Sequence, residues 1–436
     1  MSRRTACLGL LAFLVSSGAA RAAEPLAAAI DRLTAQVAPK VVAWRRDFHQ
    51  NPELSNRETR TAARVAEHLR SLGLEVKAGV AHTGVVAVLK GGKPGPVVAL
   101  RADMDALPVT EEVDLPFASK VKAEYGGQPV GVMHACGHDA HTAMLMGVAE
   151  VLAGLRQDLP GTVVFLFQPA EEGAPPGEEG GAALMVAEGA LANPAPEAIF
   201  GLHVVPMVAA GEVAFRSGGQ LAASDRLHIL VHGRQTHGGM PWEGIDPVVT
   251  AAEIVVALQA IPARQVNQLK GPSVVTVGVI KGGVRNNIVP EEVEMWGTIR
   301  SFDPGVRGEL HERVRRTAEG IAAAAGARAE VTIDQGNPVT YNDPALTRRM
   351  APTLERVAGA GKVMETLPVT WAEDFAVYQQ KIPGFFFFLG IRPPGQKVEE
   401  AAPNHSPRFA IDENALPLGV RAMANLAVDY LSGKAR

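Results

Sequence analysis

The sequence predicts an α/β protein: a mostly parallel sheet with helices on both faces, into which a second, α+β domain is inserted. Three observations support this fold class. Along the 436 residues, short apolar runs alternate with helical stretches. The runs are almost continuously apolar, which indicates strands buried on both faces. Between residues 221 and 334 the pattern changes to a self-contained series of strands and helices, and a chain of this length holds two or three domains.

The first domain, residues 23–220 and 335–436, begins with a helical pattern over residues 26–72. Its apolar side chains, among them Val65 and Leu69, recur at the spacing of one helix face. The predicted strands are apolar runs bounded by Gly or Pro, at 84–89, 97–101, 162–167, 198–202 and 384–389. Further helices are expected at 140–155 and 182–188. Together these elements predict a sheet that is covered on both faces.

The inserted domain, residues 221–334, has its own order of elements. A strand, a helix, two strands and a second helix are expected in turn at 227–231, 247–258, 273–280, 293–300 and 308–324. A last strand, up to residue 333, completes a βα, ββ, αβ order that needs no element from the flanking segments. We therefore expect this segment to form a domain of its own.

The first 22 residues have the pattern of a secretory signal peptide. Arg3 and Arg4 precede an apolar run at 6–15, and small residues with the tripeptide 20–22 form a cleavage site. The run is too short for a membrane span of about 20 residues. We expect cleavage after residue 22 or 23, no membrane span, and a periplasmic or secreted product. A poorly ordered N-terminal helix of a cytosolic protein is the alternative.

Charge and cysteine content narrow the function. With 42 basic and 46 acidic residues the formal charge is -4, so nucleic acid is not an expected partner. The two cysteines are Cys7 and Cys136, and Cys7 lies in the predicted signal peptide. The exported product would then carry one thiol and no internal disulfide. In an oxidising compartment such a thiol is protected when it is buried or bound to a metal.

Several catalytic signatures are absent from the sequence. It contains no Gly-x-Ser-x-Gly elbow, no His-Glu-x-x-His helix, no Gly-x-x-x-x-Gly-Lys loop and no Gly-x-Gly-x-x-Gly fingerprint. Serine hydrolase, ATPase and dehydrogenase functions are therefore not expected.

Polar residues follow the predicted strands, where an open parallel sheet binds its ligands. They are Asp103 and Asp105 after 97–101, Glu171 and Glu172 after 162–167, and His203 after 198–202. The loop before the helix at 140–155 adds Cys136 and His138, and the loop after the last strand adds His405. We expect all of them at one edge of the sheet.

This set has the chemistry of a metal site. Thiolate, imidazole and carboxylate ligands suit Zn, Co, Ni or Mn. Of the neighbouring acids Glu171 and Glu172, one suits metal binding and the other proton transfer. Taken singly, each feature has a structural alternative: Cys136 and His138 as a buried pair, His203 as a core histidine, the two acids as a solvated corner. Their convergence at one edge favours the metal.

The sequence resembles the M20 metallopeptidase and amidohydrolase family, in particular the N-acyl-amino-acid amidohydrolases that include hippurate hydrolases and plant auxin-conjugate hydrolases. The matching motifs are RDFH (46–49), PELS (52–55), LRADMDALP (100–108), MHACGHD (133–139), QPAEEG (168–173), GLH (201–203), EDF (373–375) and HSP (405–407). The resemblance covers nearly the whole chain after the signal peptide. It implies a zinc-exopeptidase-like catalytic domain and a ferredoxin-like inserted domain that acts as a lid and in dimerisation.

The resemblance also implies two divalent metal ions per subunit. The implied ligands are Cys136, His138, Glu172, His203 and His405. Glu171 is implied as the general base, and Asp105 as an acid that orients a ligand. Asp103 stands where related peptidases have a histidine ligand, so it is left out of the ligand set.

The inserted domain of the family usually mediates dimerisation, which implies a homodimer or a higher homo-oligomer here. It also lends a histidine, here His237, to the partner's site. Asn287 and Arg300 match positions that face a substrate carboxylate; a turn residue and a surface strand charge are their alternatives. Three further residues match family positions, and the alternative for each is a buried polar group of the framework. They are His49, Glu53 and Asp374.

From these features we expect an exported, metal-dependent amidohydrolase that cleaves N-acyl or N-aroyl amino acids. A metallo-dipeptidase or carboxypeptidase acting on short peptides is the alternative among enzymes. A periplasmic, metal-dependent solute-binding protein is the alternative from another class. Loop 173–181 and Trp242 depart from the family pattern near the site, so the acyl group stays open.

Overall fold

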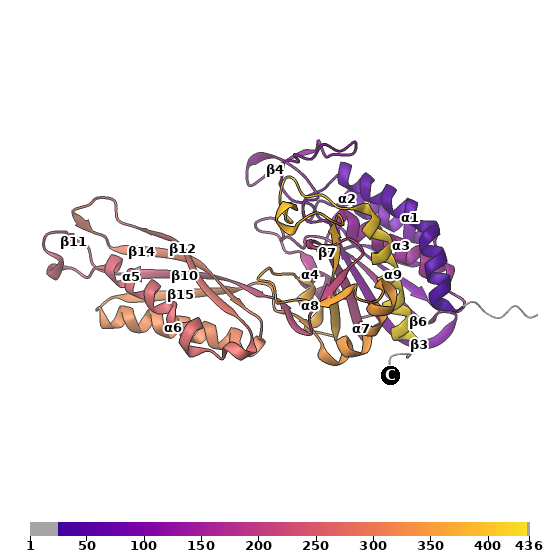
Figure 1. Cartoon of the computed structure of the whole chain (residues 1–436). Helices are drawn as coiled ribbons and strands as arrows, with labels where there is room; N and C mark the ends of the chain where they lie inside the picture. Colours follow the sequence, from indigo (N-terminus) through magenta and orange to yellow (C-terminus); the bar gives the residue numbers. More distant parts are fainter. Residues whose placement is uncertain (1–24, 434–436) are drawn as a thin grey trace, which may run out of the picture.

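The computed structural model describes residues 25–433, and the predicted signal peptide, residues 1–22, lies outside the described residues. The larger domain is built on an eight-stranded sheet (Figure 1). In sheet order its strands are β1 (Glu75–Val80), β2 (Gly84–Lys90), β6 (Pro160–Gln168), β3 (Lys93–Asp103), β7 (Ala198–Ala209), β18 (Gly384–Arg392), β8 (Val213–Phe215) and β17 (Val363–Glu365). The central strands β6, β3, β7 and β18 are mutually parallel. The predicted mostly parallel sheet is confirmed.

Helices cover both faces of this sheet, because successive side chains of its strands enter two different cores. Phe385 and Phe387 of β18 point into one core, and Phe386 and Phe388 into the other. The first face carries α1 (Leu26–Gln50), α2 (Thr59–Ser71), α3 (His138–Gly154), α7 (Pro344–Ala358) and α9 (Leu416–Leu431). The second face carries α4 (Gly181–Ala187) and α8 (Phe375–Gln379).

The helical pattern predicted over residues 26–72 is two helices, not one. Pro52 follows the end of α1, and Asn56 has a left-handed φ of 59°, so the chain leaves the helix between them. The Glu53 carboxylate then accepts the backbone N–H of Arg60 at 2.9 Å in the first turn of α2, which supports its framework role.

The sequence prediction also missed α7 and α9. Helix α9 is buried on nearly every side, so its sequence lacks a clear amphipathic period.

The inserted domain is a separate four-stranded antiparallel sheet with its own hydrophobic core. In chain order its elements are β10 (Ala223–His232), α5 (Pro247–Leu258), β12 (Ser273–Gly282), β14 (Glu292–Ser301), α6 (Pro304–Ala324) and β15 (Arg328–Gln335). The sheet order β12-β14-β10-β15 is that of a ferredoxin-like βαββαβ unit. Figure 1 shows this domain projecting away from the larger sheet.

Shorter ladders complete the fold. Strands β9 (Gly218–Leu221) and β16 (Thr340–Asn342) pair where the chain enters and leaves the inserted domain. Strands β11 (Thr236–His237) and β13 (Ile288–Val289) pair at the end of the inserted domain that is far from the larger sheet (Figure 1). Strands β4 (Lys122–Tyr125) and β5 (Gln128–Gly131) form a hairpin on the larger domain.

One stretch among the described residues, 247–265, is long and apolar enough to cross a membrane by length and composition alone. It contains α5, whose side chains Ala251, Ile254 and Leu258 are buried in the core of the inserted domain. A single stretch of this kind is weak evidence of a span, because core helices of soluble proteins can have the same length and composition.

Candidate metal centre and active site

Five predicted ligands meet at the carboxyl edge of the large sheet. The Cys136 Sγ lies 3.3 Å from His203 Nε2 and 3.3 Å from His405 Nε2. The His405 Nε2 is 3.0 Å from Glu172 Oε1, which is 4.0 Å from His138 Nε2. The donor atoms form two overlapping groups that share Cys136. The first group adds His138 and His203, and the second adds Glu172 and His405. Within each group, all donor atoms lie within 4.8 Å of one another.

Local backbone geometry brings these residues together. Gly137, between two of the donors, has a φ of 99°, and a Cβ there would lie 2.3 Å from the Val204 side chain, so glycine is required. His405 has a left-handed φ of 69°, and its backbone N–H donates to the Ala135 carbonyl at 2.7 Å. The Asn404 amide donates to the Cys136 carbonyl at 3.0 Å. The loop before α3 and the loop after β18 are thus held against each other.

Hydrogen bonds set which imidazole nitrogens face the cluster. The His138 Nδ1 lies 3.2 Å from Asp105 Oδ1, and the His203 Nδ1 lies 2.9 Å from the Val204 carbonyl. Each Nδ1 therefore carries the proton, which leaves each Nε2 as an electron-pair donor. The His138 Nε2 is buried without a hydrogen-bond partner among the described residues. A thiol, imidazoles and a carboxylate arranged in this way fit a divalent metal ion.

Asp105 ties the two halves of the site together. Its carboxylate accepts the backbone N–H of Glu171 and of Glu172, each at 3.1 Å, and the Ser55 hydroxyl at 2.7 Å. Burial acts to raise the pKa of Asp105, but the hydrogen bonds from His138 and Ser55 keep it below its usual value. The ionised Asp105 orients both His138 and the paired acids, which is the role that the resemblance implies.

Glu171 lies beside the cluster with its side chain almost fully buried. Its Oε2 is 3.9 Å from His138 Nε2, and its Oε1 accepts the backbone N–H of Asp374 at 3.4 Å. Burial, with the carboxylates of Glu373 and Glu172 nearby, raises the pKa of Glu171 well above its usual value. The Glu171 carboxyl group thus lies within reach of the donor cluster without being one of the five predicted ligands.

Arg101 is a site residue that sequence reasoning missed. It is fully buried, and its guanidinium donates to Gln168 at 2.8 Å, to Glu373 at 2.9 Å and to Asp374 at 2.8 Å. It thereby joins the ends of β3 and β6 to the segment before α8. The available signal was an arginine at the end of an otherwise apolar strand, where a buried cation requires partners.

Asp103 is held within the framework. Its Oδ1 accepts the His141 Nδ1 at 2.6 Å, and its Oδ2 pairs with Arg101. The His141 Nε2 in turn accepts the backbone N–H of Val204 at 2.9 Å. Both carboxylate oxygens of Asp103 have protein partners, but Asp103 also lies with His138 and His141 in a group that could hold a metal ion, so its exclusion from the ligand set stays a prediction.

The sequence pattern of peptidase family M20/M25/M40 matches residues 99–429. The chain belongs to this family. It is 42% identical over 392 residues to thermostable carboxypeptidase 2 of Saccharolobus solfataricus, covering 89% of this chain and 95% of that protein. It is 38% identical over 393 residues to N-acetylcysteine deacetylase of Bacillus subtilis, covering 90% and 97% of the two chains.

A solved structure agrees with this assignment. The YXEP protein of Bacillus subtilis, described as a dinuclear metal-binding peptidase of the M20 family, superposes with a TM-score of 0.77 at 36% identity. The match covers 91% of this chain and 99% of that one. The chain is therefore a metal-dependent hydrolase of amide bonds, and the predicted family and enzyme class are confirmed.

The M20 site opens into a pocket of about 360 Å³. Four of the five predicted ligands line the pocket with Glu171, namely Cys136, Glu172, His203 and His405. An apolar part of the lining consists of Leu221, Trp371, Phe388 and Pro403, and Glu373 and Asn404 complete it together with Ala372. Sequence patterns alone do not single out these apolar residues, although Trp371 stands two positions before the EDF motif.

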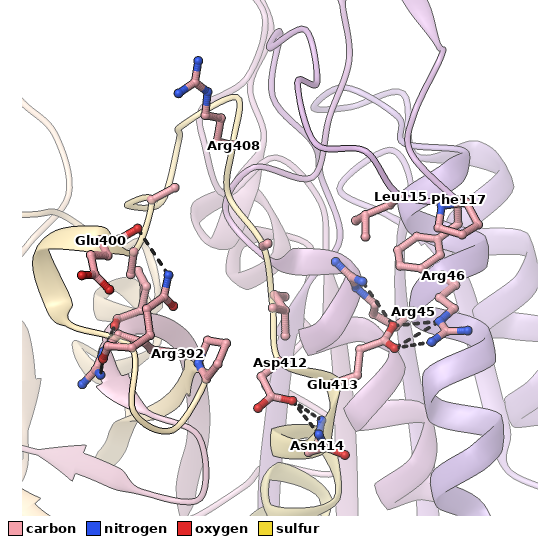
Figure 2. A pocket seen from close by; sticks show the side chains of 18 residues that line it. Arg45, Arg46, Leu115, Phe117, Arg392, Glu400, Arg408, Asp412, Glu413 and Asn414 are labelled. Atoms are coloured by element: carbon pink, nitrogen blue, oxygen red, sulfur yellow. Dashed lines mark hydrogen bonds and ion pairs between the residues drawn. The ribbon is translucent and has the colours of Figure 1, made fainter.

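A larger cavity, of about 820 Å³, lies between α1 and the segment that precedes α9 (Figure 2). Its charged side chains are paired within the protein: the Glu413 carboxylate accepts from Arg46 at 2.6 Å and from Arg45 at 3.2 Å. Arg392 donates to the Pro206 carbonyl at 3.1 Å. The metal-site donors line the smaller pocket, so we place the M20 chemistry there.

The predicted residues of the inserted domain lie in two different places. His237 is exposed in β11, and Asn287 is beside it, since its carbonyl accepts the Gly238 N–H at 2.8 Å. Arg300 is near the other end of the domain, opposite Ser224 on β10. The ten residues of β14 separate these ends by about 30 Å. Within one chain, His237 and Asn287 therefore lie far from the metal site.

Proposed function

We propose that this M20 hydrolase cleaves the amide bond of N-acyl or N-aroyl amino acids, with Glu171 as the general base. One observation carries the proposal: the nearly buried Glu171 carboxyl group, 3.9 Å from His138 Nε2, stands beside five residues whose donor atoms could hold metal ions. Such pairing of a proton acceptor with a metal site suits the hydrolysis of a linear amide.

We propose two divalent ions per subunit, held by Cys136, His138, Glu172, His203 and His405. Bound there, such ions would polarise an amide carbonyl and make nearby water more acidic. Cys136 belongs to both groups of donor atoms, so its thiol would be available to an ion held by either group.

Glu171 takes a proton from the attacking water while the water oxygen forms a bond to the amide carbonyl carbon. As the carbon–nitrogen bond breaks, Glu171 returns this proton to the leaving amine. Asp105 keeps Glu171 in place through the backbone hydrogen bond at 3.1 Å. The products are the free acid and the amino acid.

The substrate's free carboxylate is proposed to meet Arg300 and Asn287. The Arg300 Nη1 is buried without a hydrogen-bond partner among the described residues, and burial lowers its pKa. A buried donor without a partner is stabilised by an anionic ligand. Because Arg300 and Asn287 lie about 30 Å apart on one chain, a single site receives both from two subunits.

A homodimer through the inserted domain supplies the second subunit in this proposal. Strand β12 is an edge of its sheet, and Ile280 on it is 53% exposed. Helix α5 exposes Val256 at 74%. An edge strand with apolar side chains beside it is a surface that proteins usually cover. A partner on this face would carry its own His237 towards the site.

The alternative of a dipeptidase or carboxypeptidase uses the same residues on a peptide bond. The relative named as a carboxypeptidase supports it, and the relative named as a deacetylase supports the N-acyl substrate. Since the family makes the chain a hydrolase, we do not retain the solute-binding alternative.

The test is an activity screen of the metal-loaded protein against N-acyl amino acids, N-aroyl amino acids and dipeptides. We expect hydrolysis of the acylated amino acids, and loss of this activity after treatment with a chelator. Faster hydrolysis of dipeptides would favour the peptidase instead. If none of the acylated amino acids is cleaved, the proposal is wrong.

Cys136→Ala should lower the affinity for metal by more than about 100-fold, since even the outer partners of metal ligands contribute about 10- to 100-fold. Metal content after dialysis against a metal buffer measures this change. Ser119→Ala, at another small buried polar side chain, is the control and should keep its metal. Unchanged metal content in the Cys136 variant would remove it from the ligand set.

Thiol reagents are a weaker test of the same residue. Burial, with the carboxylates of Glu172 and Glu171, raises the pKa of the Cys136 thiol well above its usual value. In the metal-free protein the thiol therefore stays protonated and should react slowly. Metal content is the more direct measurement.

We also propose that the chain is exported and that the mature protein begins at residue 23 or 24. The support is the signal pattern of Arg3, Arg4 and the tripeptide 20–22. N-terminal sequencing of protein from the native host, after separation of the periplasm and medium from the cytoplasm, measures this. An intact Met1 on cytoplasmic material would contradict export.

A further inference from the structure

Trp371 is the most exposed of the large apolar side chains that line the M20 pocket. Its relative exposure is 40%, whereas those of Leu221 and Phe388 are 2% and 1%. The indole ring packs edge-on to Phe388, with the ring centroids 6.4 Å apart at 66°. Part of the ring is thus supported by the core, and the rest remains available to a ligand.

The backbone holds Trp371 in this place. Its carbonyl accepts the Ala222 N–H at 2.8 Å, and the Val369 N–H donates to the Gln220 carbonyl at 2.9 Å. These bonds fix the segment before α8 to the chain that enters the inserted domain. Since the backbone is fixed at both points, the ring is a preformed wall of the pocket.

The polar and apolar sides of the pocket suit different parts of one substrate. The donor residues and Glu171 define where the reacting amide lies. Among the described residues that line the pocket, none is Lys or Arg. The apolar side is therefore a poor place for a carboxylate, and a suitable one for the uncharged acyl group.

The pocket is also larger than a small acyl group requires. Its volume is about 360 Å³, while an apolar cavity of about 150 Å³ already holds a benzene ring. Aromatic rings pack favourably edge-to-face or offset with centroids about 4.5–7 Å apart. An aroyl group beside Trp371 would bury more of the open part of the indole than an acetyl group, which is smaller.

We propose that Trp371 is a specificity-determining residue that forms the acyl subsite and favours flat aromatic acyl groups over acetyl. This inference rests on the proposed function, because it assumes that acylated amino acids are the substrates. Trp371 acts by binding the acyl group, whereas proton transfer remains with Glu171.

The test compares kcat/KM for the N-benzoyl and N-acetyl derivatives of one amino acid. In Trp371→Ala, we expect the benzoyl-to-acetyl ratio to fall by about 10-fold or more, mostly through KM for the benzoyl substrate. In Trp371→Phe, which keeps an aromatic face, the ratio should stay within about 3-fold of wild type. Far-UV circular dichroism and the midpoint of thermal unfolding check that each variant is folded.

Tyr341→Ala is the matched control. This aromatic residue of the larger domain has the same relative exposure as Trp371, 40%, and lies outside the residues that line the pocket. The ratio should be unchanged in this variant. A ratio that stays constant in Trp371→Ala, or that shifts equally in both variants, would overturn the inference.

Two other results are distinguishable. Equal loss of both activities in Trp371→Ala would mean that the residue only supports the nearby Glu373 and Asp374, and would overturn the specificity role. A wild-type enzyme that cleaves neither acylated amino acid would overturn the proposed function and this inference with it.

Discussion

Glu171→Gln is expected to lower kcat by about 10²- to 10⁴-fold and to leave the metal content unchanged. Glutamine has the same size and can still accept the Asp374 N–H, which lies 3.4 Å from Glu171 Oε1. It has no carboxylate to take the proton from water. The change therefore removes the proposed proton transfer and preserves the structure around it.

Two measurements on each variant are needed, turnover of an N-acyl amino acid and metal content. The control is Glu179→Gln, at an exposed acid near Glu171 in the chain. The backbone carbonyl of Glu179 accepts hydrogen bonds from the side chains of Asn56 and His82. This control should keep both turnover and metal. Near-wild-type turnover of Glu171→Gln would contradict the general-base role. Loss of metal together with turnover would assign Glu171 to the ligand set instead.

His237→Ala should lower turnover by about 10²- to 10³-fold, the effect of removing one preorganised donor to a developing oxyanion. His237 is exposed at the far end of the inserted domain, where its Nδ1 accepts the Gly239 N–H at 3.0 Å. Its Nε2 therefore carries the proton and can donate it to a hydrogen bond. This donor is far from its own chain's site, so we expect it to act in a partner subunit.

Mixing the inactive Glu171→Gln and His237→Ala chains tests the sharing of sites. A heterodimer has one site in which Glu171 comes from one chain and His237 from the other. Random exchange at equal concentrations makes half of the dimers heterodimers, each with one of two sites intact, so about one quarter of wild-type activity should return. Subunit exchange is verified with differently tagged chains.

The control for the mixing experiment is His232→Ala, another histidine of the inserted domain, which pairs with Glu292 and Glu330. It should remain active by itself. If exchange is verified and the mixture stays inactive, His237 does not act across the dimer. If His237→Ala alone keeps near-normal turnover, its role is structural.

The central part of the fold was predictable because of the way in which it is buried. Strands β2, β3, β6, β7 and β18 are buried on both faces, so each appears in the sequence as an apolar run bounded by Gly or Pro. Strand β1 is mostly exposed, and β8 and β17 have three residues each. Such short or exposed strands carry little periodic signal, so they were missed.

The sequence by itself determined the family and the enzyme class, and it was enough to predict which donor residues gather near the strand ends. Chain order is enough for this, because parallel strands bring their carboxyl ends to one edge, and Glu171 and His203 follow such strands directly. The prediction of the donor residues required only the knowledge of which residues follow each strand in the sequence. It did not depend on how side chains pack.

Only the tertiary structure decided which distant side chains touch. Arg101 and Glu373 are 272 positions apart and form a buried ion pair, and Trp371 faces the metal site from a segment that sequence reasoning had left unassigned. The structure also separated Asn287 from Arg300, which the sequence had assigned to one substrate group. These contacts depend on how the segments pack in three dimensions, and chain order contains no distance between residues that meet only after folding.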